Sequence, residues 1–164
     1  MRVGIGYDIH RLEEGRRLVL GGIEIPFGKG LLGWSDADVA IHAIIDALLG
    51  AAALGDIGTY FPSGNSKYKS ISSLILLQET RKLVMGQGWQ IGNIDVTIVA
   101  EEPKLAPFID RMRKQISQTL SMDKQQIGIK AKTNDGLGCI GRGEAVAAHA
   151  IASIIKKEKI KDDR

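Results

Sequence analysis

The segment SDADVAIHAIIDALLGAAAL at residues 35–54 indicates the first helix of the chain. Its large apolar side chains recur at helical spacing, at Val39, Ile41, Ile45, Leu48 and Leu49. The S-x-x-D pattern from Ser35 to Asp38 is typical of a capping box, which marks the start of a helix. We therefore predict a helix over about residues 36–54 that buries one face.

The remaining elements follow from the same kind of periodicity on either side of this helix. Alternation between apolar and other residues, bounded by Gly, Pro, Asp or Asn, predicts strands over 2–6, 17–25, 91–99 and 127–133. Helical spacing predicts further helices over about 70–85, 103–120 and 143–157. The resulting order β-β-α-α-β-α-β-α is typical of an α/β fold, a small mixed β-sheet with helices packed on one face.

The composition is that of one ordinary globular domain. Of 164 residues, 44% are hydrophobic, 25% charged and 5% aromatic. We expect a single domain over residues 1–157 and a charged, disordered C-terminal tail over 158–164. The formal net charge is +3, but the last nine residues hold five cations and three anions, which leaves 17 cations against 16 anions elsewhere. Without a basic stripe that contains stacking aromatic residues, nucleic acid is excluded as the main partner.

The sequence also indicates the cellular compartment. A single cysteine, Cys139, cannot form an internal disulfide and is compatible with a reducing compartment. The chain has no apolar run that approaches the ~20 residues of a membrane span. We therefore expect a cytoplasmic protein without a membrane partner.

Three residues have the composition of a catalytic zinc site. Asp8 and His10 are two positions apart in the first strand, so their side chains point to the same face. His42 lies on the first helix, and two imidazoles with one carboxylate leave a fourth position for solvent or substrate. Asp38 and Asp46, one turn before and after His42, are candidates to orient its ring. The alternative is that Asp8 caps a turn, His10 lies on the surface and His42 is a core histidine. His149 is interpreted as structural.

Two glycine-rich stretches are candidates for ligand binding. The stretch KTNDGLGCIGRGE (132–144) contains a literal G-x-G-x-x-G, but it lacks the following strand and acidic residue of a dinucleotide site. Its backbone N–H groups at a helix start could instead bind an anion, together with Lys132, Thr133 and Asp135. The loop GDIGTYFP (55–62) contains a carboxylate, Asp56, that either binds a hydroxyl or caps a turn. The residues alone leave both loops equally open to a purely structural reading.

Five segments together resemble one family closely, over essentially the whole chain up to about Lys157. They are GYDIHRL (6–12), LVLGGIEIP (18–26), GLLGWSDADVAIHAIIDALLGAAALGDIGTYFP (30–62), GWQIGNIDVTIVAEEPKLAP (88–107) and KAKTNDGLGCIGRGEAVA (130–147). In order and spacing the chain resembles the 2-C-methyl-D-erythritol 2,4-cyclodiphosphate synthases of the non-mevalonate isoprenoid pathway. The resemblance implies a phosphorus–oxygen lyase that converts 4-diphosphocytidyl-2-C-methyl-D-erythritol 2-phosphate to the cyclic 2,4-diphosphate and releases CMP.

The resemblance also implies metals, an assembly and a set of site residues. Zinc would bind Asp8, His10 and His42, and magnesium or manganese would bind Asp135. A homotrimer is implied, with active sites between subunits and a central channel that binds an isoprenoid diphosphate in some members. Thr133 would support the charge of the transition state, and Trp34 would act through its backbone. The implied substrate-binding residues are Asp8, His10, Trp34, Ser35, Asp56, Ile57, Gly58, Phe61, Pro62, Ser63, Gly64, Asn65, Ala100, Pro103, Lys104, Leu105, Ala106, Ala131, Lys132, Thr133, Asn134, Asp135, Cys139 and Arg142.

The sequence departs from the family pattern at three of these positions. Trp34 stands where the family often has a histidine beside the reacting phosphates. Asp135 replaces the more usual glutamate and is one methylene shorter. Cys139 stands where an aromatic residue often lines the central channel, next to Arg142, which would face that channel. Two other functions therefore stay open at this point: a metal-dependent phosphohydrolase that activates water at the same trio, and a non-catalytic trimeric protein that binds isoprenoid diphosphates.

Overall fold

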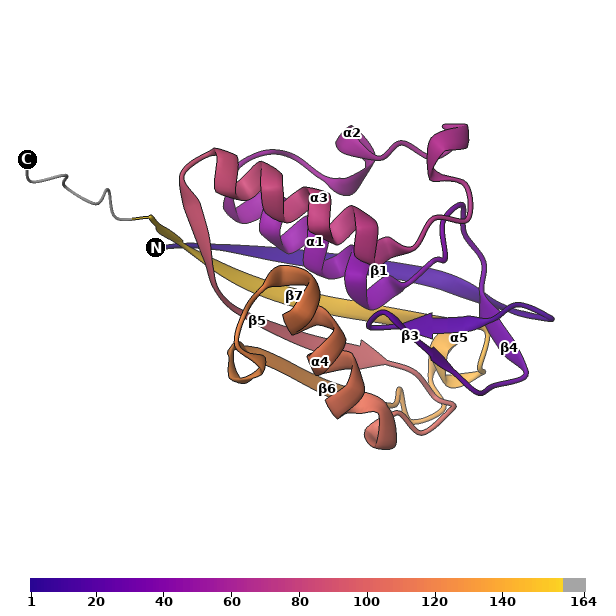
Figure 1. Cartoon of the computed structure of the whole chain (residues 1–164). Coiled ribbons are helices and arrows are strands. Elements are labelled where there is room, and N and C mark those ends of the chain that lie inside the picture. Colours follow the sequence, from indigo (N-terminus) through magenta and orange to yellow (C-terminus); the bar gives the residue numbers. More distant parts are fainter. Residues whose placement is uncertain (158–164) are drawn as a thin grey trace, which may run out of the picture.

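The computed structural model describes residues 1–157, which form one α/β domain (Figure 1). Its main sheet has the strand order β4-β1-β7-β5-β6, and all neighbouring pairs are antiparallel except β5 and β6. The strands are β1 (Arg2–Glu14), β4 (Lys29–Leu31), β5 (Trp89–Val99), β6 (Ile127–Lys132) and β7 (Ala145–Lys156), while β2 (Leu18–Leu20) and β3 (Ile23–Ile25) form a separate hairpin. The predicted mixed sheet is confirmed. The predicted tail, 158–164, lies outside the described residues.

Three long helices cover one face of this sheet (Figure 1). They are α1 (Val39–Ala51), α3 (Ser73–Gly86) and α4 (Ile109–Leu120). The connections contain the short helices α2 (Ile57–Tyr60) and α5 (Gly138–Gly141) and the 3₁₀ turns η1 (Ser66–Tyr68), η2 (Ala106–Phe108) and η3 (Lys124–Gln126). The three helices predicted from periodicity over 36–54, 70–85 and 103–120 are confirmed, each with a later start.

The start of α1 differs from the predicted capping box. Asp38, not Ser35, is the N-cap, and its carboxylate accepts hydrogen bonds from the backbone N–H groups of Ala40 and Ile41. The same buried carboxylate accepts from Gly21 and Gly22 of the β2–β3 turn, at 3.0 and 2.7 Å. Asp38 therefore joins the hairpin to the helix start, and Ser35 lies in the preceding loop.

The predicted fourth helix, over 143–157, is wrong. These residues form β7, which lies between β1 and β5 at the centre of the sheet. Alanine favours helices, but here Ala148, Ala150 and Ala152 are small residues on the inner face of a strand, where α1 packs against the sheet. The intervening residues point outward, His149 among them, and its ring lies 4.8 Å from that of Tyr7.

The predicted strand over 17–25 is two strands joined by a tight turn. Gly21 and Gly22 have φ values of +59° and +78°, a conformation that glycine adopts without steric cost. The predicted strand 2–6 continues to Glu14, because its alternation of faces extends through Asp8 and His10. This extension keeps both side chains in regular strand geometry.

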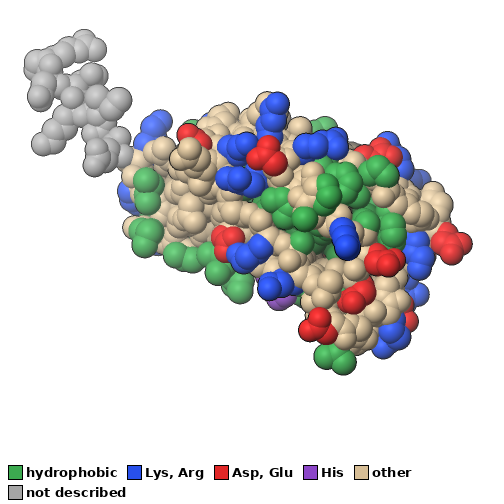
Figure 2. Space-filling view, turned by 90° about the horizontal axis from the view of Figure 1, so that it is seen from below, with side chains coloured by type: hydrophobic (Ala, Val, Ile, Leu, Met, Phe, Trp, Pro, Cys, Tyr) green, Lys and Arg blue, Asp and Glu red, His purple; other side chains and the backbone are tan. Residues whose placement is uncertain are grey.

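The outer face of the sheet is exposed and largely apolar. Its large side chains are Val3, Ile5, Tyr7, Ile9, Ile151 and Ile155, and Ile5 is 72% exposed. Figure 2, which views the molecule from below, shows acidic and basic side chains interspersed around a group of hydrophobic ones. Within the described chain, no helix has the length and apolar character needed to cross a membrane.

Candidate metal centre and substrate-binding loops

Asp8, His10 and His42 converge at the junction of β1 and α1. The Asp8 carboxylate oxygen Oδ2 lies 3.1 Å from Nε2 of His10 and 2.9 Å from Nδ1 of His42. One ligand atom of each residue lies within 4.8 Å of the other two. The i, i+2 spacing on β1 accounts for the first pair, and the close packing of α1 on β1 brings His42 to it. The structure thus forms the trio predicted from the sequence.

Asp8 and His10 shift each other's pKa values. Burial alone would raise the pKa of Asp8, but hydrogen bonds to His10 and His42 outweigh it and lower that pKa to about 2. Burial would lower the pKa of His10, but the Asp8 carboxylate outweighs it and raises that pKa. Asp8 is therefore an anion at neutral pH, as a metal ligand must be.

The ring nitrogens that face away from Asp8 are held by hydrogen bonds. Nδ1 of His10 lies 2.6 Å from the Leu32 carbonyl oxygen, so it donates its proton there. Nε2 of His42 lies 2.9 Å from the Ser73 hydroxyl and 3.2 Å from the Ser35 hydroxyl. These contacts leave Nε2 of His10 and Nδ1 of His42 to face the shared space, and two imidazole nitrogens with one carboxylate fit a zinc ion that keeps an open position.

The prediction that Asp38 or Asp46 orients His42 is wrong for the described residues. Asp38 caps α1, and Asp46 accepts a hydrogen bond from the Ile57 N–H at 2.7 Å. The hydroxyls of Ser35 and Ser73 contact the ring instead. Sequence reasoning missed Ser73, because residues 70–73 fell inside the helix predicted over 70–85 and had no further signal of their own.

The loop after α1 is fixed by hydrogen bonds at two points. Asp56 is the N-cap of α2 and accepts hydrogen bonds from the N–H and hydroxyl of Thr59, which lower its pKa. Trp34 donates its indole N–H to the Asn65 carbonyl oxygen at 2.9 Å. The indole therefore links the segment that contains Phe61, Pro62, Ser63 and Gly64 to the loop that precedes the candidate metal ligand His42.

The other predicted binding segments meet where β5 and β6 end. Because these strands are parallel, both carboxyl ends lie at the same edge, and the Ala100 N–H donates to the Lys132 carbonyl oxygen at 2.9 Å. The Glu101 carboxylate accepts from the N–H groups of Asn134 and Gly136 at 3.1 and 3.3 Å. Glu101 thus shapes the 133–137 turn, in which Asp135 has a φ of +50°. No motif or periodicity in the sequence singles out Glu101.

The candidate metal trio and the edge where β5 and β6 end lie at the same end of the sheet but on different strands. Asp8 pairs with Ala148, which pairs with Ile98, which pairs with Ala131. Three strand spacings separate Asp8 from Ala131, or about 14 Å. Within one chain the trio and the β5–β6 edge are therefore aligned but not in contact.

The glycine-rich stretch leads into a short turn rather than a long helix. Its helix, α5, has four residues, and β7 follows it. Cys139 on α5 is exposed, and Arg142 donates two hydrogen bonds to the Glu144 carboxylate at 2.9 and 3.1 Å. This ion pair raises the pKa of Arg142 and lowers that of Glu144.

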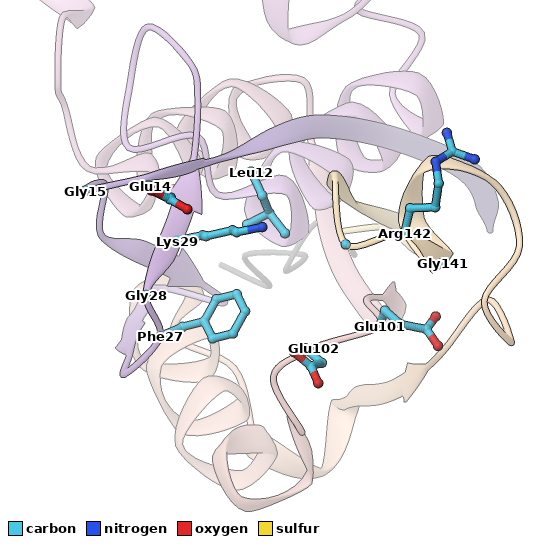
Figure 3. Close-up of a pocket in the computed structure, with 11 residues that line it drawn as sticks. Leu12, Glu14, Gly15, Phe27, Gly28, Lys29, Glu101, Glu102, Gly141 and Arg142 are labelled. Atoms are coloured by element: carbon cyan, nitrogen blue, oxygen red, sulfur yellow. The ribbon is translucent and has the colours of Figure 1, made fainter.

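A cavity of about 730 Å³ lies between this turn, the β1–β4 side and the Glu101–Glu102 segment. In Figure 3, Phe27 and Lys29 point into it and the Arg142 guanidinium points away. Its lining residues in the described chain do not include the metal trio. The cavity is therefore separate from the metal centre.

Comparison with known proteins identifies the family. The chain matches the YgbB family over residues 1–155. It is 57% identical over 154 residues to the 2-C-methyl-D-erythritol 2,4-cyclodiphosphate synthase of Syntrophomonas wolfei, covering 94% of this chain and 98% of that protein. It is 55% identical to the synthase of Clostridium acetobutylicum, covering 94% and 100%.

Solved structures agree. The IspF–CDP complex of Plasmodium falciparum superposes with a TM-score of 0.84 at 37% identity, covering 96% of this chain and 97% of that chain. The bifunctional IspDF of Campylobacter jejuni superposes with a TM-score of 0.92 at 38% identity. The match covers 96% of this chain and 42% of that longer chain. The chain therefore belongs to the YgbB family, the family of the 2-C-methyl-D-erythritol 2,4-cyclodiphosphate synthases, and is an enzyme of the lyase class.

Proposed function

We propose that the protein converts 4-diphosphocytidyl-2-C-methyl-D-erythritol 2-phosphate to 2-C-methyl-D-erythritol 2,4-cyclodiphosphate and CMP. The observation that carries this proposal is the convergence of Asp8, His10 and His42 within 4.8 Å in a chain of this family. An oxygen of the 2-phosphate attacks the β-phosphorus and forms a new P–O bond. The bond from the β-phosphorus to the bridging oxygen breaks, and CMP leaves with that electron pair.

The chemistry needs positioning more than proton transfer. The nucleophile is already an anionic phosphate oxygen, so a strong general base is unnecessary. Because both reacting groups belong to one substrate, holding its two ends replaces a second association step. Residues 56–58 and 61–65 would hold the methylerythritol phosphate, while residues 100–106 and 131–135 would hold the cytidine and its phosphates. The CDP bound in the Plasmodium falciparum relative supports a cytidine-linked substrate.

Two metal ions are assigned to the site. Asp8, His10 and His42 would hold zinc, and Asp135 would hold magnesium or manganese with the substrate. When bound, such cations neutralise phosphate charge and fix the geometry of transfer. The Thr133 hydroxyl donates a hydrogen bond to Oδ1 of Asp135 at 3.3 Å. The same hydroxyl would support the charge of the transition state. Trp34 would act through its backbone, while its indole holds the Asn65 loop.

A homotrimer with active sites between subunits accounts for two observations. The exposed apolar face of the sheet, which includes Ile5 and Val3, is suited to contact with another copy of the chain. The separation of about 14 Å between the metal trio and the β5–β6 edge suggests that each site combines the two halves from neighbouring chains. Arg142 would then face the central channel, where an isoprenoid diphosphate would have to compete with the Glu144 carboxylate.

Product analysis by ³¹P NMR tests the proposed reaction. The purified protein with zinc and magnesium should yield CMP and a cyclic diphosphate in equal amounts. Open products that contain CDP or phosphate would instead indicate a phosphohydrolase, and absence of turnover with intact metal would indicate a binding protein. The His42→Ala variant should remain folded and lose turnover, because it removes a ligand rather than a core anchor.

A further inference from the structure

The two ring nitrogens of His42 face different chemical groups. Nδ1 lies 2.9 Å from the Asp8 carboxylate, on the side where the metal ligands converge. Nε2 points away from them, toward the Ser73 hydroxyl at 2.9 Å. A histidine can bind a metal through Nδ1 only when that nitrogen carries a lone pair, so the proton of the neutral ring must sit on Nε2. What determines the tautomer is therefore the group that Nε2 meets.

In its contact with Nε2 of His42, the Ser73 hydroxyl can act only as the acceptor. Its single proton is donated to Oδ1 of Asp36. That carboxylate is fixed in turn, because Oδ2 accepts from the Ser73 N–H at 2.9 Å and Oδ1 accepts from the Asp38 N–H at 3.2 Å. Ser73 is fully buried, so bulk water does not offer its proton another acceptor.

We propose that Asp36 and Ser73 are positioning residues that hold His42 in its Nε2-protonated tautomer, with Nδ1 free to bind the metal. The assignment rests on the metal centre of the proposed function. Asp36 accepts the hydrogen bond of the Ser73 hydroxyl, and that hydroxyl accepts the hydrogen bond of the Nε2–H of His42. A metal ion would then displace only the proton that Nδ1 shares with Asp8 in the metal-free site. On His10 the Leu32 carbonyl oxygen has the corresponding role.

Ser35 does not replace Ser73 in this role. Its hydroxyl lies 3.2 Å from Nε2 of His42 and accepts from the Ala37 N–H, and no acceptor for its own proton is recorded within residues 1–157. Ser35 can therefore donate to an unprotonated Nε2 as readily as it accepts from a protonated one. Without Ser73, the carboxylate of Asp8 would favour a proton on Nδ1, and that proton would compete with the metal.

The test is zinc affinity, measured by competition with a chromogenic chelator on the metal-free protein. Ser73→Ala should bind zinc about 10- to 100-fold more weakly than the wild type, the range found for partners that orient metal-binding histidines. The matched control is Ser72→Ala. Ser72 is the N-cap of α3 and accepts from the Leu74 N–H, so its loss weakens the same helix start without touching His42.

The role of Asp36 is tested by a double-mutant cycle. Asp36→Ala should also weaken zinc binding, and the double variant should bind no more weakly than Ser73→Ala, since both residues act through one hydrogen bond to His42. Thermal unfolding of the metal-free variants checks that each is folded. Zinc binding by Ser73→Ala at the wild-type affinity, or an equal loss in Ser72→Ala, would overturn the positioning role. A wild-type protein that binds no zinc would overturn the metal centre itself.

Discussion

Gly6 of β1 lies directly under Ala43 of α1: a Cβ atom at Gly6 would come 1.9 Å from the Ala43 carbonyl oxygen. Gly4 has the same relationship to Ala47, at 2.1 Å. At these two positions the backbone of α1 therefore packs directly against the backbone of β1, with no side chain between them. Because Asp8 follows Gly6 by two residues and His42 precedes Ala43, this close approach brings the two ligands together.

Replacing Gly6 should damage both the fold and the metal centre. In Gly6→Ala the new methyl group meets backbone atoms that cannot move aside, so we expect the free energy of unfolding to fall by about 3 kcal/mol. Zinc affinity should fall as well, since α1 must shift away from β1. Urea denaturation measures the first effect. Gly86→Ala is the control, because a Cβ atom there meets nothing within 4 Å and Gly86 does not have a positive φ; equal midpoints for the two variants would contradict the packing described.

A charge on the outer face of the sheet should break the proposed trimer. Ile5 is 72% exposed on that face, and Ile5→Lys would place an ammonium group in the proposed interface. We expect sedimentation velocity to show monomers and turnover to drop at least about tenfold, since one chain would hold only half of each site in the proposed trimer. Ile75→Lys on α3, where Ile75 is 49% exposed, should leave the assembly unchanged. A fully active monomeric Ile5→Lys variant would contradict the shared site.

The stability of the metal-free protein should depend on pH through Asp8 and His10. The pKa of Asp8 is lowered from 3.8 to about 2, so its contribution of roughly 2 kcal/mol is present above pH 3.8 and is lost as the pH falls toward 2. The pKa of His10 is raised above 6.5, so its contribution is present below pH 6.5 and is lost as the pH rises through the raised value. In chelator-treated samples, the difference in unfolding free energy between wild type and Asp8→Asn should be largest between about pH 4 and 6.5. A difference that does not vary with pH would rule out this coupling.

Asp135 should govern the response to magnesium. Loss of its carboxylate in Asp135→Ala should raise the magnesium concentration for half-maximal turnover about tenfold, since an interaction with a charged group is lost. Asp135→Glu restores the carboxylate and should bring most of the response back. Glu79→Ala removes an exposed carboxylate that pairs with Lys82 on α3 and serves as the control. An unchanged magnesium titration in Asp135→Ala would remove this residue from the site.

The sequence predicted the elements with clear periodicity and failed where tertiary packing overrides local preference. Alternation in the first strand placed Asp8 and His10 on one face, and helical spacing placed His42 on a helix. The segment that forms β7 looked helical because of its alanines, yet Ala148 and Ala150 are small so that α1 can pack against the sheet. These alanines alternate with His149 and Ile151, which is the pattern of a strand. The high helix propensity of alanine obscured this pattern.

The candidate site was predictable to a similar degree. Residue types and strand spacing predicted the candidate metal trio, which the structure brings together, and the resemblance predicted binding loops that stay a proposal. The residues that orient His42 were beyond reach, because Ser73 and Asp36 are 37 positions apart and meet only through the packing of α3 on α1. Asp38 and Asp46 had the correct helical spacing, but their carboxylates are used by backbone N–H groups.

Anomalous diffraction at the zinc absorption edge, on crystals of protein that was never exposed to chelators, tests the central claim most directly. The account predicts one strong peak per chain among Oδ2 of Asp8, Nε2 of His10 and Nδ1 of His42. The absence of a peak among these three atoms would contradict it.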